Sequence, residues 1–161
     1  MQTIKKVFIA GGTGFLGYHA ALKFLDLGIQ VDTIALENEI EISNWFDSRI
    51  HLSYGNLFTM NESEIYNLLK DKNYDCFIYA LGPDDRYIPK APAYDFFYDR
   101  LVRQCKKICQ AAKRANIQRC VILGSYFATY DKHMNGKLSK YHPYIKARIQ
   151  QEQELIALGK D

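Results

Sequence analysis

Apolar residues along the chain follow two patterns. Short continuous apolar runs predict strands that are buried on both faces, and apolar residues three or four positions apart predict helices with one buried side. The predicted strands span Ile4–Ala10, Val31–Leu36, Ile50–Tyr54, Asp75–Leu81 and Arg119–Leu123. The predicted helices span Phe15–Leu27, Ile40–Phe46, Glu62–Lys72, Tyr94–Ala115 and Lys140–Leu158.

Glycines and a polar pair mark several helix ends. Gly28 follows the first helix and is expected to form its C-terminal cap. Asn61 precedes another helix, with Glu64 three residues on, which predicts a capping box. Gly159 is the predicted stop of the last helix.

Strand and helix alternate along the whole chain, with no repeat, low-complexity tract or linker. This alternation predicts an α/β fold, a doubly wound parallel sheet with helices on both faces and right-handed crossovers. We expect a single domain over residues 1–161, with its ligand at the carboxyl ends of the strands.

A glycine-rich stretch, Gly11 to Gly17, joins the first strand to the first helix. Gly11 can adopt the positive φ of a sharp turn, Gly14 lets a pyrophosphate approach the backbone, and Gly17 lets the helix pack close to the strand. The unpaired N–H groups of the helix N-terminus then face the phosphates. A glycine turn without a ligand is the alternative, but the flanking strand and helix favour a Rossmann-like dinucleotide site.

The 161 residues carry a net charge of +3, and 48% of them are hydrophobic. This charge is too small to indicate a nucleic-acid partner, and no apolar run approaches the length of a membrane span. The N-terminus leads straight into a strand with no signal-peptide pattern, so we expect a cytoplasmic protein.

The chain has four cysteines, all in apolar segments: Cys76, Cys105, Cys109 and Cys120. Cys105 and Cys109 are four residues apart on a predicted helix, a spacing that also suits two metal ligands. No second pair of ligands accompanies them. We therefore predict buried thiols in a reducing compartment and no metal site.

The glycine spacing is Gly-x-x-Gly-x-x-Gly, with Thr13 before the second glycine and Phe15 and Leu16 after it. This pattern resembles the short-chain dehydrogenase/reductase superfamily, and most of all its extended branch of NAD-dependent epimerases and dehydratases of nucleotide sugars. The resemblance implies that Thr13, Phe15 and Leu16 bind the cofactor together with the three glycines.

Two further segments match the cofactor site of that superfamily. The first, Gly55 to Leu57, stands where extended members carry Gly-Asp-Leu, whose acid contacts adenine, and Asn56 can donate to or accept from the ring instead. The second, Asp75 to Gly82, resembles the strand that flanks the cofactor. The resemblance assigns these residues of the two segments to the cofactor: Asn56, Leu57, Ala80, Leu81 and Gly82.

The residue that distinguishes NAD from NADP is expected about 20 residues after the glycines, at the end of the second strand. Glu37 stands there and can bind the ribose hydroxyls of NAD, although a solvated loop acid is an equally good interpretation. No basic residue offers itself to the 2′-phosphate of NADP. The cofactor is therefore NAD or NADP, and the balance favours NAD.

The segment His142 to Arg148 matches the part of the superfamily that holds a catalytic Tyr-x-x-x-Lys. Tyr144 takes the place of the tyrosine, the general acid/base, and Arg148 stands where the lysine is expected. Arg148 keeps a positive charge one helical turn from Tyr144 and can favour the phenolate. It cannot relay a proton, and its planar fork makes different hydrogen bonds from an ammonium.

The catalytic serine or threonine of the superfamily follows the fifth strand, where this chain reads Gly124 to Thr129. Ser125 matches the second serine of the usual pair, and Tyr126 occupies the usual catalytic position. Ser125 or Thr129 is the candidate to hold a substrate hydroxyl. Leu101 stands where some members carry a helical asparagine that relays protons.

These residues support two hypotheses. In the first, the protein is an enzyme that exchanges hydride between NAD(P) and a small-molecule substrate such as a nucleotide sugar, with Tyr144, Arg148 and Ser125 as its catalytic set. In the second, it is a regulatory or partner module that binds NAD(P) without turnover, since the glycines are intact and the catalytic set is altered.

The resemblance also bears on size and assembly. Members of the extended branch continue into a small C-terminal substrate domain, which we expect to be absent from residues 1–161. They often form homodimers by pairing two helices into a four-helix bundle. The helices Tyr94–Ala115 and Lys140–Leu158 are expected to form that interface.

Overall fold

The computed structural model describes residues 3–37, 44–87 and 89–160. The chain forms two compact units. The sheet unit comprises Met1–Leu81 and Ala111–Leu123, and the helical unit comprises Gly82–Gln110 and Gly124–Asp161. That residues 1–161 act as one cofactor-binding domain stays a prediction.

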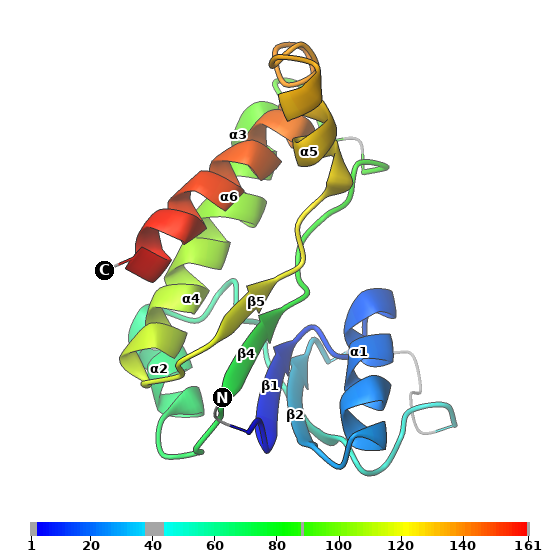
Figure 1. The fold of residues 1–161 in the computed structure, drawn as a ribbon, viewed down its shortest axis with the longest axis vertical. Coiled ribbons are helices and arrows are strands. Elements are labelled where there is room, and N and C mark those ends of the chain that lie inside the picture. The colour runs from blue at the N-terminus through cyan, green and yellow to red at the C-terminus, as the bar shows by residue number, and fades with distance from the viewer. Residues whose placement is uncertain (1–2, 38–43, 88, 161) are drawn as a thin grey trace. The chain divides into compact units, whose positions relative to one another are not determined.

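The sheet unit is built on five parallel strands (Figure 1). They are β1 (Lys6–Ala10), β2 (Gln30–Ala35), β3 (His51–Tyr54), β4 (Cys76–Tyr79) and β5 (Cys120–Ile122). Their order across the sheet is β3-β2-β1-β4-β5, and all neighbouring pairs are parallel. The direction of winding reverses between β1 and β4, so a ligand site is expected at the carboxyl ends of these two strands.

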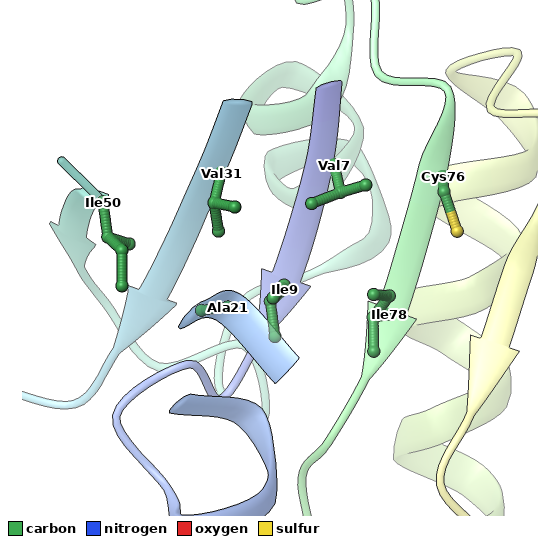
Figure 2. Packing of buried hydrophobic residues seen from close by; sticks show 7 residues of the cluster. All are labelled: Val7, Ile9, Ala21, Val31, Ile50, Cys76 and Ile78. Carbon is green, nitrogen blue, oxygen red and sulfur yellow. The ribbon is translucent and has the colours of Figure 1, made fainter. Parts of the chain in front are cut away.

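Helices cover both faces of the sheet. On one face, a cluster of buried side chains surrounds Ala21 of α1 (Phe15–Asp26), as Figure 2 shows. The strand and loop residues of this cluster are Val7, Ile9, Val31, Ile50, Cys76 and Ile78. On the other face, the rings of Phe8 and Phe77 stack with centroids 5.7 Å apart, and α2 (Glu62–Leu69) lies behind the strands in Figure 2. The predicted doubly wound α/β fold is confirmed.

Local capping explains where α1 ends and α2 begins. Gly28 lies in the left-handed region at φ +73°, and its N–H donates to the Leu25 carbonyl at 2.9 Å. The Asn61 side chain accepts from the Glu64 N–H at 3.0 Å, and the Glu64 carboxylate accepts from the Asn61 N–H at 2.7 Å. Both predicted caps are confirmed.

The helical unit contains a long helix made of three consecutive segments. These are α3 (Tyr94–Phe97), the π-helical segment η1 (Tyr98–Arg103) and α4 (Gln104–Arg114), whose last turn belongs to the sheet unit. A further helix, α6 (Pro143–Lys160), packs against α3 and η1. Residues of α3 and η1 form an apolar cluster with residues of α6. The cluster includes Phe97, Leu101, Val102, Tyr144, Ile145 and Ala147.

One helix of this unit is missing from the sequence predictions. The pattern predicts no helix between the fifth strand and Lys140, but α5 (Tyr126–His133) forms there. Only Ala128 and Asp131 are buried on α5, so the segment lacks the apolar period that would reveal a helix.

Two further predictions concern the end of the last helix and the short helix Ile40–Phe46. Gly159, the predicted stop, is wrong in that role, because α6 continues through it to Lys160. A glycine inside a helix costs only about 1 kcal/mol relative to alanine, so it need not end one. The predicted helix Ile40–Phe46 falls mostly on residues 38–43, which lie outside the described residues, and residues 44–46 form a turn and bend.

The cysteines are buried at three positions, as predicted, but Cys120 is exposed. Cys120 lies on β5, which is last in the sheet order and, among the described strands, has a neighbour on one side only. Burial raises the pKa of the Cys76 thiol. The Sγ atoms of Cys105 and Cys109 are 4.0 Å apart.

Two features of the described residues concern metal binding and membrane insertion. Within residues 3–37, 44–87 and 89–160, no three His, Cys, Asp or Glu side chains are grouped so that they could hold a metal ion. Over the same ranges, every helix is too short or too polar to cross a lipid bilayer.

Candidate functional site

The glycine turn between β1 and α1 is held in place by Thr33 of β2. Gly11 adopts a φ of +92°, and the next N–H, that of Gly12, donates to Thr33 Oγ1 at 2.9 Å. The same hydroxyl donates to the Ile9 carbonyl at 2.5 Å. Because Thr33 is completely buried, these two hydrogen bonds replace contacts with water and fix the turn at the carboxyl ends of two adjacent strands.

The glycines of the turn are needed for different reasons. A Cβ on Gly17 would collide with the Gly11 carbonyl, and one on Gly12 would collide with the Thr33 side chain, so the fold itself excludes side chains there. Gly14 is exposed at an ordinary φ of −77°, and of the described residues a Cβ on it would meet only the Gly11 carbonyl oxygen, at 3.3 Å. The fold leaves space next to Gly14, as the close approach of a pyrophosphate requires.

The N-terminus of α1 adds electrostatic attraction at this position. The N–H groups of Phe15, Leu16 and Gly17 have no acceptor inside the helix, because the helix begins there. The first turn contains no acidic residue to compensate the positive end of the helix dipole. Phe15 and Leu16 are 79% and 60% exposed, and Thr13 before them is partly buried. This end of the helix therefore suits an anion such as a phosphate.

A pocket of about 60 Å³ lies at the carboxyl ends of β2 and β3. It is lined by Ile34, Ala35, Leu36, Gly55, Asn56, Leu57, Phe58 and Leu81. We call it the base pocket, since its size and apolar walls suit a flat heterocycle. A neighbouring open hollow shares Leu36 and Asn56 with it and is also lined by Glu37, so this exposed carboxylate lies next to the base pocket.

The end of β4 completes this side of the turn. The Ala80 N–H donates to the Ala10 carbonyl at 2.9 Å, and Leu81 lines the base pocket. The Leu81 side chain also occupies the space that a Cβ on Gly11 would need. Gly82, at φ +118°, belongs to the helical unit. All other predicted cofactor residues lie in the sheet unit, at the carboxyl ends of β1, β2, β3 and β4.

Tyr144 and Arg148 are joined by a hydrogen bond on α6. Arg148 Nε donates to Tyr144 Oη at 3.1 Å, and Arg148 Nη1 donates to Gln151 Oε1 at 2.8 Å. All three side chains are buried, with 3%, 8% and 2% exposed for Tyr144, Arg148 and Gln151. The ring of Phe97 packs edge-on against that of Tyr144 at 5.4 Å. The guanidinium charge is thus held directly at the phenolic oxygen.

Ser125 lies at the N-cap of α5. Its Oγ accepts from the Phe127 N–H at 3.3 Å, so this hydroxyl helps to begin the helix. The hydroxyl proton is still available to donate. Thr129, the other candidate, is exposed on α5.

Asp131 of α5 holds the loop that leads to α6. Its buried carboxylate accepts from the Leu138 and Ser139 N–H groups at 2.8 and 2.9 Å. Burial acts to raise the pKa of Asp131, but the hydrogen bonds from Ser139 and Leu138 outweigh it and lower this pKa. The stabilisation is therefore present near neutral pH and is lost as the pH falls through the lowered pKa.

Two residues of these arrangements were not identified from the sequence. Thr33 is a polar residue inside the apolar run Val31–Leu36. Because a buried hydroxyl needs hydrogen-bond partners, the sequence alone could have identified Thr33 as a hydrogen-bonding residue. Gln151 stands among other polar residues of the last helix, and nothing in the sequence distinguishes it.

Replacing Thr33 by valine should lower the free energy of unfolding by about 1–3 kcal/mol, because valine has the same shape and leaves the Gly12 N–H and the Ile9 carbonyl without their partner. Urea denaturation followed by circular dichroism measures this change. The matched control is Thr59→Val, which removes an exposed hydroxyl that donates to the Asn56 carbonyl at 3.0 Å and should cost at most about 0.5 kcal/mol. Equal effects of the two substitutions would contradict the role of Thr33.

Solved structures from several bacteria share this fold. The NAD⁺ complex of the Bordetella bronchiseptica enzyme WbmH has a TM-score of 0.71 at 17% identity, over 98% of this chain and 53% of that one. WbmG from the same organism, in complex with NAD and UDP, has a TM-score of 0.72 at 13% identity, over 96% and 50%. The UDP-Glc/GlcNAc 4-epimerase of Campylobacter jejuni has 0.70 at 13%, over 95% and 48%.

The chain thus spans about half the length of these enzymes. No curated protein matches it significantly. The sequence model of the NAD dependent epimerase/dehydratase family, however, matches residues 7–161, which include the glycine turn, the base pocket and α6. The chain therefore belongs to the NAD-dependent epimerase/dehydratase family.

Proposed function

We propose that the sheet unit binds NAD(H) and that the protein uses it in epimerase- or dehydratase-type chemistry on a nucleotide sugar. One observation carries the binding: the exposed Gly14, which the fold itself does not need, stands beside the unpaired N–H groups of α1. The proposed cofactor residues are Gly11, Thr13, Gly14, Phe15, Leu16, Gly17, Glu37, Asn56, Leu57, Ala80, Leu81 and Gly82. Structures with the same fold contain NAD, and in one case also UDP.

Glu37 favours NAD over NADP in this proposal. Its carboxylate lies beside the base pocket at the end of β2 and can accept hydrogen bonds from both ribose hydroxyls. A phosphate on the 2′ oxygen would remove one of these donors and place negative charge next to the carboxylate.

Tyr144 is proposed to move the proton at the reacting oxygen of the substrate. When bound, NAD supplies the hydride acceptor. As a phenolate, whose negative charge Arg148 would stabilise from 3.1 Å, Tyr144 would take the proton of the substrate hydroxyl and become a neutral phenol. Ser125 is proposed to hold the substrate hydroxyl. Arg148 stays charged throughout and does not pass the proton on.

A second candidate is a module that binds the same cofactor without turnover. The burial of Tyr144 favours it, since a general acid/base must reach the substrate, and so does the second bond of Arg148, to Gln151. Under either candidate, we propose a cytoplasmic homodimer formed through the helices Tyr94–Ala115 and Lys140–Leu158.

Calorimetric titration with NAD(H) and NADP(H), followed by turnover assays with a panel of nucleotide sugars, tests the proposal. The longest natural form of the chain should be used. We expect NAD(H) to bind at least about tenfold more tightly than NADP(H), and a nucleotide sugar to be converted. Binding without conversion would favour the second candidate, and no binding of either dinucleotide would refute both.

A further inference from the structure

Among the described residues that line the base pocket, Asn56 is the one with a polar side chain. Its Oδ1 accepts from the Phe58 N–H at 3.0 Å. A backbone N–H is only a donor, so this bond determines which end of the amide is the oxygen. The group that Asn56 has left for a ligand is Nδ2, with its two N–H donors.

A protein can distinguish purines by the polar group at position 6 of the ring. Adenine carries an amino group there, which is a donor, whereas a 6-oxopurine such as hypoxanthine carries a carbonyl acceptor. An aspartate at position 56 would keep one oxygen on the Phe58 N–H and offer the other to the amino group. The asparagine offers N–H donors in that place, which match a carbonyl and oppose an amino group.

We propose that Asn56 contacts position 6 of the bound purine through Nδ2, so that the chain accepts a dinucleotide with a 6-oxopurine base at least as well as NAD. The inference rests on the proposed function, because the dinucleotide must occupy the sheet unit. The apolar walls of the pocket increase the discrimination, since a donor left unpaired there has no water to replace the lost bond.

Calorimetry on the wild type and on Asn56→Asp tests the inference, with NAD and nicotinamide hypoxanthine dinucleotide as the two probes. The measured quantity is the Kd for NAD divided by the Kd for the hypoxanthine compound. Aspartate has the same shape as asparagine and keeps an oxygen for the Phe58 N–H, so the loop is retained. We expect the ratio to fall by about tenfold in Asn56→Asp, since aspartate improves the contact with adenine and opposes the carbonyl.

Asn135→Asp is the matched control. It makes the same change of charge at an exposed residue of the helical unit, at φ +53°, where aspartate is also tolerated. The ratio should stay at its wild-type value in this variant. A change smaller than about threefold in Asn56→Asp, or a change in the opposite direction, would overturn the inference and leave NAD binding intact. If the wild type bound neither compound, the proposed function itself would fail.

Discussion

Replacing Gly14 by valine should weaken NAD(H) binding by about a hundredfold while the fold stays intact. The valine side chain would occupy the space where a pyrophosphate approaches the backbone, and overpacking of this kind costs about 1–3 kcal/mol, where each 1.4 kcal/mol is tenfold in Kd. Within the described part of the chain, the first carbon of that side chain meets only the Gly11 carbonyl oxygen, at 3.3 Å, so folding is little affected. Calorimetry measures the binding, and thermal unfolding followed by circular dichroism checks the fold.

Two other glycines provide the controls. Gly159→Val makes the same substitution where a Cβ meets no described residue within 4 Å, and should leave NAD(H) binding unchanged. Gly17→Ala should destabilise the sheet unit, because its Cβ would collide with the Gly11 carbonyl. If Gly14→Val bound NAD(H) and NADP(H) as the wild type does, the glycine turn would not be a phosphate site.

The parts of the fold that the sequence predicts are those with a local cause. Gly28 and Asn61 end and begin helices through bonds to residues within four positions, and the apolar runs that became β1, β2 and β4 are typical of strands buried on both faces of a parallel sheet. The glycine spacing is local in the same sense, because Gly11, Gly14 and Gly17 all lie within or next to one turn between a strand and the next helix. The Gly14 prediction follows from that spacing.

The parts that were missed depend on contacts between distant segments. Thr33 holds a turn that lies more than twenty residues before it, and no short pattern reveals that partnership. α5 is missed because a polar, exposed helix has no apolar period, although Ser125 is a good N-cap. The bond between Arg148 and Tyr144 follows from their spacing of four on a helix, whereas the second bond, to Gln151, required the structure.

Replacing Arg148 by lysine should raise the rate of turnover if the protein is an enzyme that works through Tyr144. Lysine would restore the residue that the superfamily uses to contact the nicotinamide ribose and to relay a proton, and acid–base assistance of this kind is typically worth about 10²–10⁴-fold. Tyr144→Phe should lower the rate by a similar factor, because it removes the hydroxyl proposed as the acid/base, which also accepts from Arg148 Nε. Steady-state assays of both variants with the nucleotide-sugar panel measure these changes.

The controls make the same substitutions on exposed side chains of the helical unit. Arg103→Lys alters an exposed ion pair with Asp99, and Tyr141→Phe alters a side chain that is 80% exposed, so neither should change the rate. If the rate changes in Arg148→Lys or Tyr144→Phe but not in these controls, the change is due to the position of the residue and not to the type of substitution.

The direction of the Arg148→Lys effect distinguishes three functions of this arginine. A higher rate means that the family mechanism operates and that the arginine limits it. No turnover in either protein, with a change in cofactor affinity at most, means a binding module. A lower rate means that the planar fork is adapted to a substrate carboxylate or phosphate, which a guanidinium holds with two parallel hydrogen bonds and an ammonium does not.

Lysine also cannot reproduce the paired bonds to Tyr144 and Gln151, so thermal unfolding of Arg148→Lys must be measured beside its rate. Activity that survives in Tyr144→Phe would exclude Tyr144 as the acid/base.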